Sequence, residues 1–320
     1  MLDIGQPESP QSLPLIVSAG AQSAGSPEGL LERYASERES MEAHLLQHGA
    51  LLFRGFGIDT QEILSRVVRP LGGEALGYID GNSPRRKLGS GVYTSTEYPP
   101  EFFISLHNEL SYSSRWPSRV FFCCAIAPQE GGQTPLADSR RILQRLPDDV
   151  RDAFVTRQVK YIRNLHGGSG FGPSWQATFE TDSRDEVSEF CRTEGTEARW
   201  NDDGSLTITQ VRPATRIHPK TGEEVWFNQA DQFHPSTHPA VIYESLLALY
   251  GREELMPQTA TFGDGSPIEV ASLDEVRRTV GEEMRLFSWQ RGDLLMVDNM
   301  LVCHGRRPFS GPRKILVSMT

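Results

Sequence analysis

Residues 104–112 read Ile-Ser-Leu-His-Asn-Glu-Leu-Ser-Tyr, an apolar, strand-like run that leads into the tripeptide His107-Asn-Glu109. In an extended chain, side chains two positions apart point to the same face and are separated by about 6.5 Å along the strand. His107 and Glu109 can therefore converge on one metal ion. The eight histidines and 42 acidic residues among 320 predict about one such tripeptide by chance, so the motif needs support from elsewhere in the chain.

A second histidine supplies that support at the end of the strand-like run Leu294-Leu-Met-Val-Asp-Asn-Met-Leu-Val-Cys-His304. Two imidazoles and one carboxylate on one face of an iron ion leave positions open for a cosubstrate, a substrate and O₂. Cys303 beside His304 suggests a zinc or thiol site as an alternative, but neighbouring residues of a strand point to opposite faces. We therefore predict that His107, Glu109 and His304 bind iron(II).

Nine residues after His304, Arg313 begins the run Arg-Lys-Ile-Leu-Val-Ser-Met. Strand alternation places Arg313 on one face with Ile315, Val317 and Met319. A guanidinium beside a metal suits the distal carboxylate of a 2-oxo diacid, because its fork matches carboxylate geometry. We predict this role for Arg313, with the Thr134 hydroxyl as a second donor; the alternatives are a surface ion pair for Arg313 and an ordinary turn for Thr134.

The rest of the chain predicts a β core with helices around it or inserted between its strands. Helical spacing and end signals predict helices over 27–49, 60–71, 139–146, from 147 onward, 183–194, 238–250 and 272–286. Short apolar or alternating runs predict strands over 50–54, 104–106, 120–127, 206–211, 224–228, 293–297, 301–304 and 314–319. Asp138 or Ser139 is expected to cap the helix that ends near Leu146.

Three regions are expected along the chain. Residues 1–27 are rich in Gln, Ser, Pro, Gly and Ala without periodicity, which predicts a loosely ordered lead-in that docks on the body. Residues 28–320 are expected to form a single oxygenase domain, because neither a repeat nor a long linker divides them. The 197 positions that separate His107 from His304 leave room for an insertion at about 160–285, acting as a lid or an oligomer contact.

Substrate contacts are expected from polar or aromatic residues near the metal motif or in the insertion. The hypothesised set is Tyr112, Arg163, Asn164, Phe227 and Asn228. Each of these side chains has a structural role as its alternative.

Composition limits the class of partner. The formal net charge is −10, and the acidic residues are spread through polar stretches rather than gathered in a tail, so neither nucleic acid nor an anionic membrane is an expected partner. We identify no signal peptide and no membrane span in the sequence. Four cysteines without a CxxC pair predict reduced thiols and a cytoplasmic location.

Four stretches together resemble the TauD/TfdA (taurine dioxygenase-like) superfamily. They are Gly49-Ala-Leu-Leu-Phe-Arg-Gly-Phe56, His107-Asn-Glu-Leu-Ser-Tyr112, Gly131-Gly-Gln-Thr-Pro-Leu-Ala-Asp-Ser139 and His304-Gly-Arg-Arg-Pro-Phe-Ser-Gly-Pro-Arg313. Thr94-Ser-Thr-Glu-Tyr-Pro-Pro and the glutamate of the metal motif are most similar to the SyrP-like branch, which is associated with hydroxylation of free or carrier-bound amino acids in natural-product pathways.

The resemblance implies a double-stranded β-helix (jelly roll) with helical insertions. It implies that His107, Glu109 and His304 bind iron(II), and that Thr134 and Arg313 bind the cosubstrate 2-oxoglutarate. The implied reaction uses O₂, converts 2-oxoglutarate to succinate and CO₂, and hydroxylates an unactivated carbon of an amino acid or an amino-acid-derived intermediate. A small-molecule substrate, either free or presented on a carrier protein, and a homo-oligomer are the partners considered.

Two departures from related members narrow the chemistry. Members that bind a sulfonate have a second arginine four residues after the cosubstrate arginine, where this chain has Val317, so taurine is disfavoured as substrate. Related halogenases replace the acidic ligand with a small residue, whereas Glu109 fills this position. Hydroxylation is the expected outcome; desaturation or cyclisation by the same cofactors, and a catalytically silent β-barrel protein that binds a metal or a small acid, are the alternatives.

Overall fold

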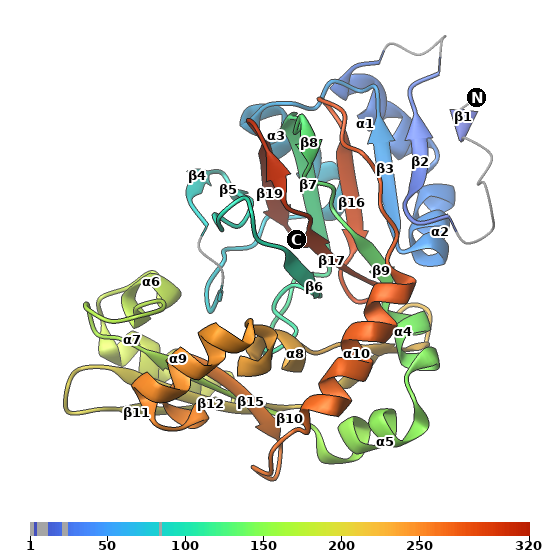
Figure 1. The fold of residues 1–320 in the computed structure, drawn as a ribbon. Coiled ribbons are helices and arrows are strands. Elements are labelled where there is room, and N and C mark those ends of the chain that lie inside the picture. The colour runs from blue at the N-terminus through green and yellow to red at the C-terminus, as the bar shows by residue number, and fades with distance from the viewer. Residues whose placement is uncertain (1–2, 5–11, 21–24, 83–84) are drawn as a thin grey trace.

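The larger of two core sheets combines strands from both ends of the chain. A computed structural model describes residues 3–4, 12–20, 25–82 and 85–320 (Figure 1). The sheet order is β1-β2-β3-β16-β7-β19-β5-β4, and all neighbours are antiparallel except β2 and β3. The bounds are β1 Asp3–Ile4, β2 Leu15–Ser18, β3 Ala50–Arg54, β4 Lys87–Gly89, β5 Val92–Thr94, β7 Arg119–Ile126, β16 Leu294–Asp298 and β19 Lys314–Met319.

A smaller sheet faces the larger one. Its order is β6 (Ile104–His107), β17 (Val302–Arg306) and β9 (Leu136–Asp138), and a short ribbon of β8 (Glu130–Gly131) and β18 (Phe309–Ser310) lies beside it. One cavity is lined by residues of both sheets. The fold is therefore the expected jelly roll with an all-β core, in which two sheets face each other without closing into a barrel.

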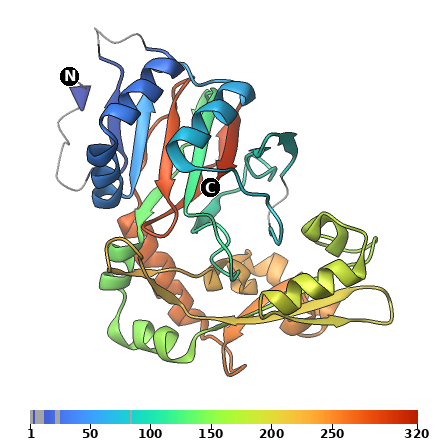
Figure 2. The same cartoon turned by 180° about the vertical axis from the view of Figure 1, so that it is seen from behind.

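Strand alternation gives the larger sheet two apolar faces. Leu51 and Phe53 of β3 pack in one cluster with the N-terminal helices, whereas Ala50 and Leu52 pack in the cluster toward the smaller sheet. The helices that cover the outer face are α1 Pro27–Ser36, α2 Arg38–His48 and α3 Gln61–Gly72 (Figure 2). Because both faces are covered, the central strands are almost continuously apolar.

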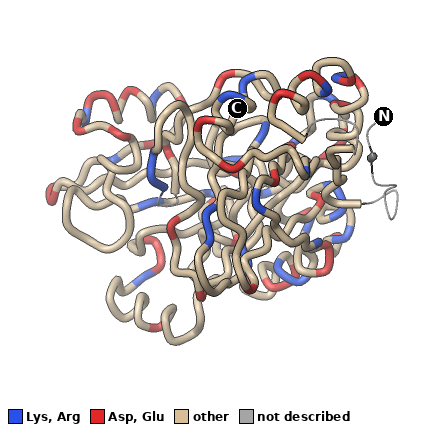
Figure 3. The backbone as a smooth tube through the Cα atoms, turned by 90° about the horizontal axis from the view of Figure 1, so that it is seen from above, with Lys and Arg blue, Asp and Glu red and all other residues tan. Residues whose placement is uncertain are grey.

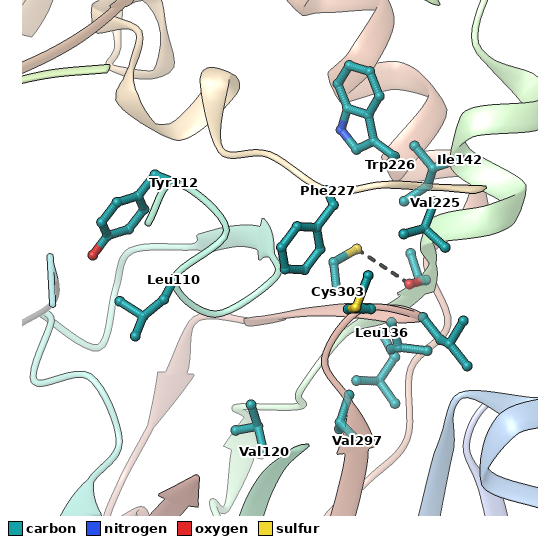
Figure 4. Packing of buried hydrophobic residues seen from close by; sticks show 14 of the residues in the cluster. Leu110, Tyr112, Val120, Leu136, Ile142, Val225, Trp226, Phe227, Val297 and Cys303 are labelled. Atoms are coloured by element: carbon teal, nitrogen blue, oxygen red, sulfur yellow. Dashed lines mark hydrogen bonds between the residues drawn. The ribbon is translucent and has the colours of Figure 1, made fainter. Parts of the chain in front are cut away.

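The inner cluster continues beyond the sheets. Figure 4 shows Leu136 close to Cys303, and the α4 residue Ile142 near Val225. Helix α4 (Ser139–Arg145) begins where β9 ends, and its N-cap is Asp138, whose side chain accepts from the Arg140 N–H. This packing fixes the end of the smaller sheet against the helical side of the molecule.

Residues 159–262 build a second sheet apart from the jelly roll (Figure 1). Its strand order is β11 (Glu197–Trp200), β12 (Leu206–Arg212), β10 (Val159–Leu165) and β15 (Gln258–Phe262). The other elements of this half are β13 Thr215–Ile217, β14 Glu224–Trp226, α5 Asp148–Arg157, α6 Trp175–Phe179, α7 Arg184–Thr193, α8 Ala230–Phe233, η1 Pro235–Thr237, α9 Ala240–Tyr250, η2 Glu253–Leu255 and α10 Val270–Glu283.

The long first helix expected over 27–49 is wrong in one respect, because the structure divides it into α1 and α2. Glu37 leaves the helical conformation at φ −113° and ψ 23°. The bend allows both Tyr34 of α1 and Met41 of α2 to be buried against the sheet, and the Tyr34 hydroxyl donates to Glu42 across the junction at 2.6 Å. Apolar spacing alone does not reveal such a bend, because both halves keep the helical period.

The N-terminal lead-in is more ordered at one point than its composition predicts. Leu15–Ser18 form β2, which pairs in parallel with β3 and buries Leu15 and Val17. Residues 1–2, 5–11 and 21–24 of the lead-in lie outside the described part of the chain. A four-residue strand has too few residues to show periodicity within a stretch rich in Ser, Pro and Gly.

Charged residues of both signs are interspersed along the chain (Figure 3). Among the described residues, no helix combines the length and the apolar character that crossing a membrane requires.

We predict that Leu51→Ala lowers the free energy of unfolding by about 2–5 kcal/mol, because Leu51 is fully buried between the larger sheet and its covering helices. The matched control is Leu286→Ala, whose side chain is 51% exposed and should change stability by less than about 0.5 kcal/mol. Urea unfolding followed by circular dichroism measures both. Equal losses in the two variants would contradict this account of the core.

Candidate metal and cosubstrate site

The smaller sheet brings the two predicted histidine ligands face to face. His304 of β17 is the direct antiparallel partner of His107 at the end of β6, and their ring centroids are 4.8 Å apart. The Nε2 atom of His304 lies 3.8 Å from Oε2 of Glu109. One ligand atom from each of the three residues lies within 4.8 Å of the others, and all three residues are buried.

Both imidazoles keep at least one ring nitrogen free for a metal. His107 Nδ1 lies 2.9 Å from the Ser105 carbonyl, so donation from Nδ1–H leaves Nε2 as the ligand atom. Burial, followed by the influence of His304, lowers the pKa of His107 to about 4, which keeps this imidazole neutral, as metal binding requires. His304 has no hydrogen-bond partner for either buried ring nitrogen.

Glu109 reaches the site from a turn rather than from a continuous strand. Strand β6 ends at His107, so the two-residue alternation expected from the sequence does not extend to Glu109. Asn299 holds the turn instead: its Oδ1 accepts from the Glu109 N–H at 2.7 Å and its Nδ2 donates to the Glu109 carbonyl at 2.9 Å. The side chain of Asn108 also stabilises the turn, because its Nδ2 donates to the Asn299 carbonyl at 2.6 Å.

Arg85 is a charged residue of the site that the sequence analysis missed. Its Nη2 donates to Glu109 Oε2 at 2.5 Å, and both side chains are 3% exposed. Burial alone would favour the neutral acid, but the Arg85 guanidinium outweighs it and holds the pKa of Glu109 well below its usual range. The carboxylate is therefore ionised, which is the form that binds a cation.

The alternative thiol site at Cys303 does not fit the geometry. The Cys303 thiol donates to the Ala137 carbonyl at 3.4 Å and belongs to the apolar cluster (Figure 4). Burial raises the pKa of Cys303 to about 12, so a protonated thiol is expected. The strand alternation predicted for Cys303 and His304 separates the thiol from the imidazole.

The predicted cosubstrate residues lie in the same cavity as the histidines. It is lined by Thr134 and Arg313 together with His107 and His304. Arg313 donates from Nε to the Gly132 carbonyl at 3.1 Å, and among the described residues no carboxylate forms an ion pair with it. Burial and then the nearby Arg306 lower the pKa of Arg313 to about 10, so it stays cationic at neutral pH.

Thr134 is oriented by a residue that the sequence analysis did not identify. The Trp289 indole donates to Thr134 Oγ1 at 3.1 Å, which leaves the hydroxyl hydrogen for another acceptor. The expected alternation after Arg313 also holds, because Ile315 and Val317 line the cavity with it. The cavity thus offers the Arg313 guanidinium and the Thr134 hydroxyl beside apolar side chains of β19.

Two of the hypothesised substrate residues are engaged with a loop instead. The Tyr112 hydroxyl donates to the Asp80 carbonyl at 2.7 Å. Arg163 donates to the same carbonyl at 3.1 Å and forms an ion pair with the Asp80 carboxylate. Both side chains are buried, and their partners show that they anchor the segment leading to Arg85.

The other three hypothesised substrate residues lie apart from the cavity that holds the cosubstrate candidates. Asn164 donates to the carbonyls of Glu254 and Met256 at 2.8 and 2.7 Å, within the second sheet region. Phe227 packs edge-on against the Trp116 ring, with centroids 5.1 Å apart. Asn228 donates to the Ala214 carbonyl at 2.9 Å, but it also lines a separate cavity of about 110 Å³ beside His107.

The donor set fits a divalent metal. His304 presents buried nitrogens without a partner, His107 keeps Nε2 free, and Glu109 is ionised in the same place. Two imidazoles and one carboxylate with open positions are the donor set of non-haem iron(II) oxygenases. Together with the jelly roll, this set defines the class of protein.

The comparison with family models agrees with this class. The model described as "Taurine catabolism dioxygenase TauD, TfdA family" matches residues 17–320. The chain belongs to the TauD/TfdA family and is an iron(II)- and 2-oxoglutarate-dependent dioxygenase that acts on a small molecule. The catalytically silent alternative is thereby set aside.

Curated relatives match along most of their length. The chain is 38% identical over 275 residues to the dapdiamide synthesis protein DdaC of Enterobacter agglomerans, covering 86% of this chain and 83% of the relative. It is 32% identical over 297 residues to a clavaminate synthase-like protein of Arabidopsis thaliana, covering 89% and 85%.

Solved structures share the fold at low sequence identity. The structure of PvcB from Pseudomonas aeruginosa is similar with a TM-score of 0.55 at 16% identity, covering 97% of this chain and 86% of that one. AAD-2 in complex with Mn(II) and N-oxalylglycine has a TM-score of 0.57 at 15% identity, covering 100% and 96%. These similarities support the jelly roll found here.

We predict that Asn299→Ala weakens metal binding by about 10–100-fold, because Glu109 loses the two hydrogen bonds that hold its backbone while all three donor groups remain. Anaerobic titration calorimetry with Co(II) measures the affinity. Asn201→Ala, in the distant turn after β11, is the matched control and should bind metal normally. A folded Asn299→Ala protein with unchanged affinity would contradict the role assigned to this residue.

Proposed function

We propose that His107, Glu109 and His304 hold iron(II), that Thr134 and Arg313 bind the distal carboxylate of 2-oxoglutarate, and that the enzyme hydroxylates an unactivated carbon of an amino acid or an amino-acid-derived intermediate. The observation that carries this proposal is the cavity between the two sheets. There the two histidines of the three-donor cluster line one wall with Arg313, a cation without a carboxylate partner among the described residues. A buried charge without a partner is unfavourable. The distal carboxylate of 2-oxoglutarate would supply the missing negative partner of Arg313.

The substrate class rests on the relatives and on the sequence. DdaC is named for dapdiamide synthesis, and PvcB is described as an iron, alpha-ketoglutarate-dependent oxygenase from an isonitrile synthetic pathway. These names, with the SyrP-like wording of residues 94–100, support an amino-acid-derived substrate in natural-product biosynthesis. The substrate is free or presented on a carrier protein, and desaturation or cyclisation stays the alternative outcome.

Bound iron and 2-oxoglutarate supply the oxidising power, with O₂ consumed and succinate and CO₂ formed. The chain's own residues supply position and exclusion of water. Phe122 packs edge-on against His304 at a centroid distance of 4.9 Å, and Ile315 and Val317 line the same cavity. These apolar neighbours keep bulk water from the reacting groups, which limits side reactions.

The central experiment is aerobic turnover with a panel of amino acids, free and tethered as thioesters, following succinate and product mass together. We expect succinate in equal amount to a product that has gained one oxygen atom; loss of two hydrogen atoms would indicate desaturation or cyclisation instead. Arg313→Met should raise the KM for 2-oxoglutarate, because it removes the guanidinium that is proposed to bind the distal carboxylate. If anaerobic iron and 2-oxoglutarate gave no visible charge-transfer band, the assignment of the site would fail.

We further propose that residues 28–320 act as one oxygenase domain and that the insertion at about 160–285 joins two copies of the chain rather than serving only as a lid. Helix α9 within it has no buried residue, and Val241 and Leu249 are 73% and 72% exposed. Exposed apolar side chains on one helix favour an interface.

The buried, unpaired cysteines support a reducing location such as the cytoplasm.

We predict that the double variant Val241→Glu/Leu249→Glu lowers the molar mass in solution from that of a dimer to that of one chain, measured by light scattering after size-exclusion chromatography. Charges introduced on an apolar contact are costly to bury. The control pair Glu39→Gln and Glu62→Gln, on α2 and α3, should leave the mass unchanged. A wild-type protein that is already a single chain at high concentration would refute the contact.

A further inference from the structure

Within the described part of the chain, Arg85 is the buried cation that forms an ion pair with a proposed metal ligand. Its side chain is 3% exposed, and its Nη2 donates a hydrogen bond to Glu109 Oε2 at 2.5 Å. The guanidinium lies over the Tyr78 ring at 4.5 Å from the centroid and lines the cavity together with His107, His304 and Arg313. It is therefore close enough to contact whatever binds at the metal.

The guanidinium has hydrogen-bonding capacity that the protein does not use. Its Nε and Nη1 atoms are buried and have no acceptor among the residues that the structure describes. Buried N–H groups are almost always paired. A buried N–H without an acceptor has given up its hydrogen bonds to water and gained none in return, which is unfavourable. Nε and Nη1 lie on different edges of the guanidinium, and Nη2 has a second hydrogen besides the one that Glu109 accepts. One edge, formed by that Nη2 hydrogen and either Nε or Nη1, can therefore donate to both oxygens of one carboxylate.

The charges around the cavity also call for a further anion. Three arginines, Arg85, Arg306 and Arg313, line it without any lining carboxylate, and Glu109 adds one negative charge at its edge. A divalent metal and dianionic 2-oxoglutarate cancel each other, so two positive charges remain when both are bound. Arg306 donates from both terminal nitrogens to the carbonyls of Tyr98, Pro99 and Phe102 and keeps only Nε unpaired. Arg85 keeps two buried nitrogens without an acceptor among the described residues.

The segment before Arg85 is held from two sides. Asp80 is fixed by Arg163 of β10 and by the Tyr112 hydroxyl, and the Tyr78 N–H donates to the Tyr93 hydroxyl of β5 at 3.0 Å. These contacts bind the segment to both the second sheet and the jelly roll. Arg85 itself is held by Glu109 and by the Tyr78 ring.

We propose that Arg85 recognises a free carboxylate of the substrate and so positions the substrate at the metal. This inference rests on the proposed function and adds to it the anionic group by which the substrate is selected. It assigns Arg85 to the substrate, whereas Arg313 serves the cosubstrate. A substrate bound in this way keeps its own carboxylate while a carbon elsewhere in it is oxidised.

The test measures binding separately from turnover. Enzyme loaded anaerobically with Co(II) and 2-oxoglutarate is titrated by calorimetry with a panel of amino acids, their primary amides, and simple carboxylic acids without an amino group. We expect wild-type enzyme to bind a carboxylate ligand about 10–100-fold more tightly than its amide, as for a hydrogen-bonded charge. Arg85→Met should abolish this preference, and Arg85→Lys should retain part of it.

The control is Arg86→Met, because Arg86 is exposed and pairs with the exposed Glu97; its carboxylate preference should equal that of wild type. Circular dichroism and the Co(II) affinity of each variant show whether the fold and the Glu109 ligand are retained. Arg85→Lys keeps the buried charge beside Glu109 and provides the test if Arg85→Met does not fold.

Several outcomes would overturn the inference. Arg85→Met with an unchanged acid-to-amide ratio and weaker metal binding would make Arg85 a positioning residue for Glu109 alone. A loss confined to 2-oxoglutarate affinity would assign Arg85 to the cosubstrate, and failure of every carboxylate to bind would also refute the proposal. Tight, Arg85-dependent binding of acids that lack an amino group would support the role of Arg85 while removing amino acids from the proposed function.

Discussion

The antiparallel pairing of β6 with β17 is the constraint on which the site depends. It sets His107 directly opposite His304 across two strands that are far apart in the sequence. A register shift of one residue would turn either imidazole to the other face of the sheet. Gly305 helps to fix this register, because a Cβ there would lie 2.4 Å from the Ile104 carbonyl oxygen. The close backbone contact is therefore possible only with glycine beside the ligand.

Much of the fold could be predicted because its signals are local. Buried strands such as Ala50–Arg54 and Lys314–Met319 are short apolar runs, and Asp138 caps its helix as expected. The same strand alternation placed Arg313 correctly on the face of Ile315 and Val317. The bend at Glu37 was missed, because it changes direction without changing the period.

The site was predictable only where ligand chemistry leaves a sequence motif. His107, Glu109 and His304 were found because imidazoles and a carboxylate follow strand-like runs. Arg85 and Asn299 were missed since their roles arise from contacts across 24 and 190 positions, and no local pattern marks them. Tyr112 and Arg163 were singled out for their chemistry, but the structure gives both of them Asp80 as a partner.

The order of strands in the two sheets also has a consequence for how the protein is made. Strands β16, β17 and β19 lie at the centre of the core, yet they come from residues 294–319. A chain still emerging from the ribosome has Glu109 and His107 long before it has His304 or Arg313. Early domains usually fold as they emerge, but here both sheets stay incomplete until residues 294–319 have been made. The three-donor set is therefore complete only after His304 has been made. Until then, the apolar strands β3 and β7 lack β16, the strand that pairs with both of them.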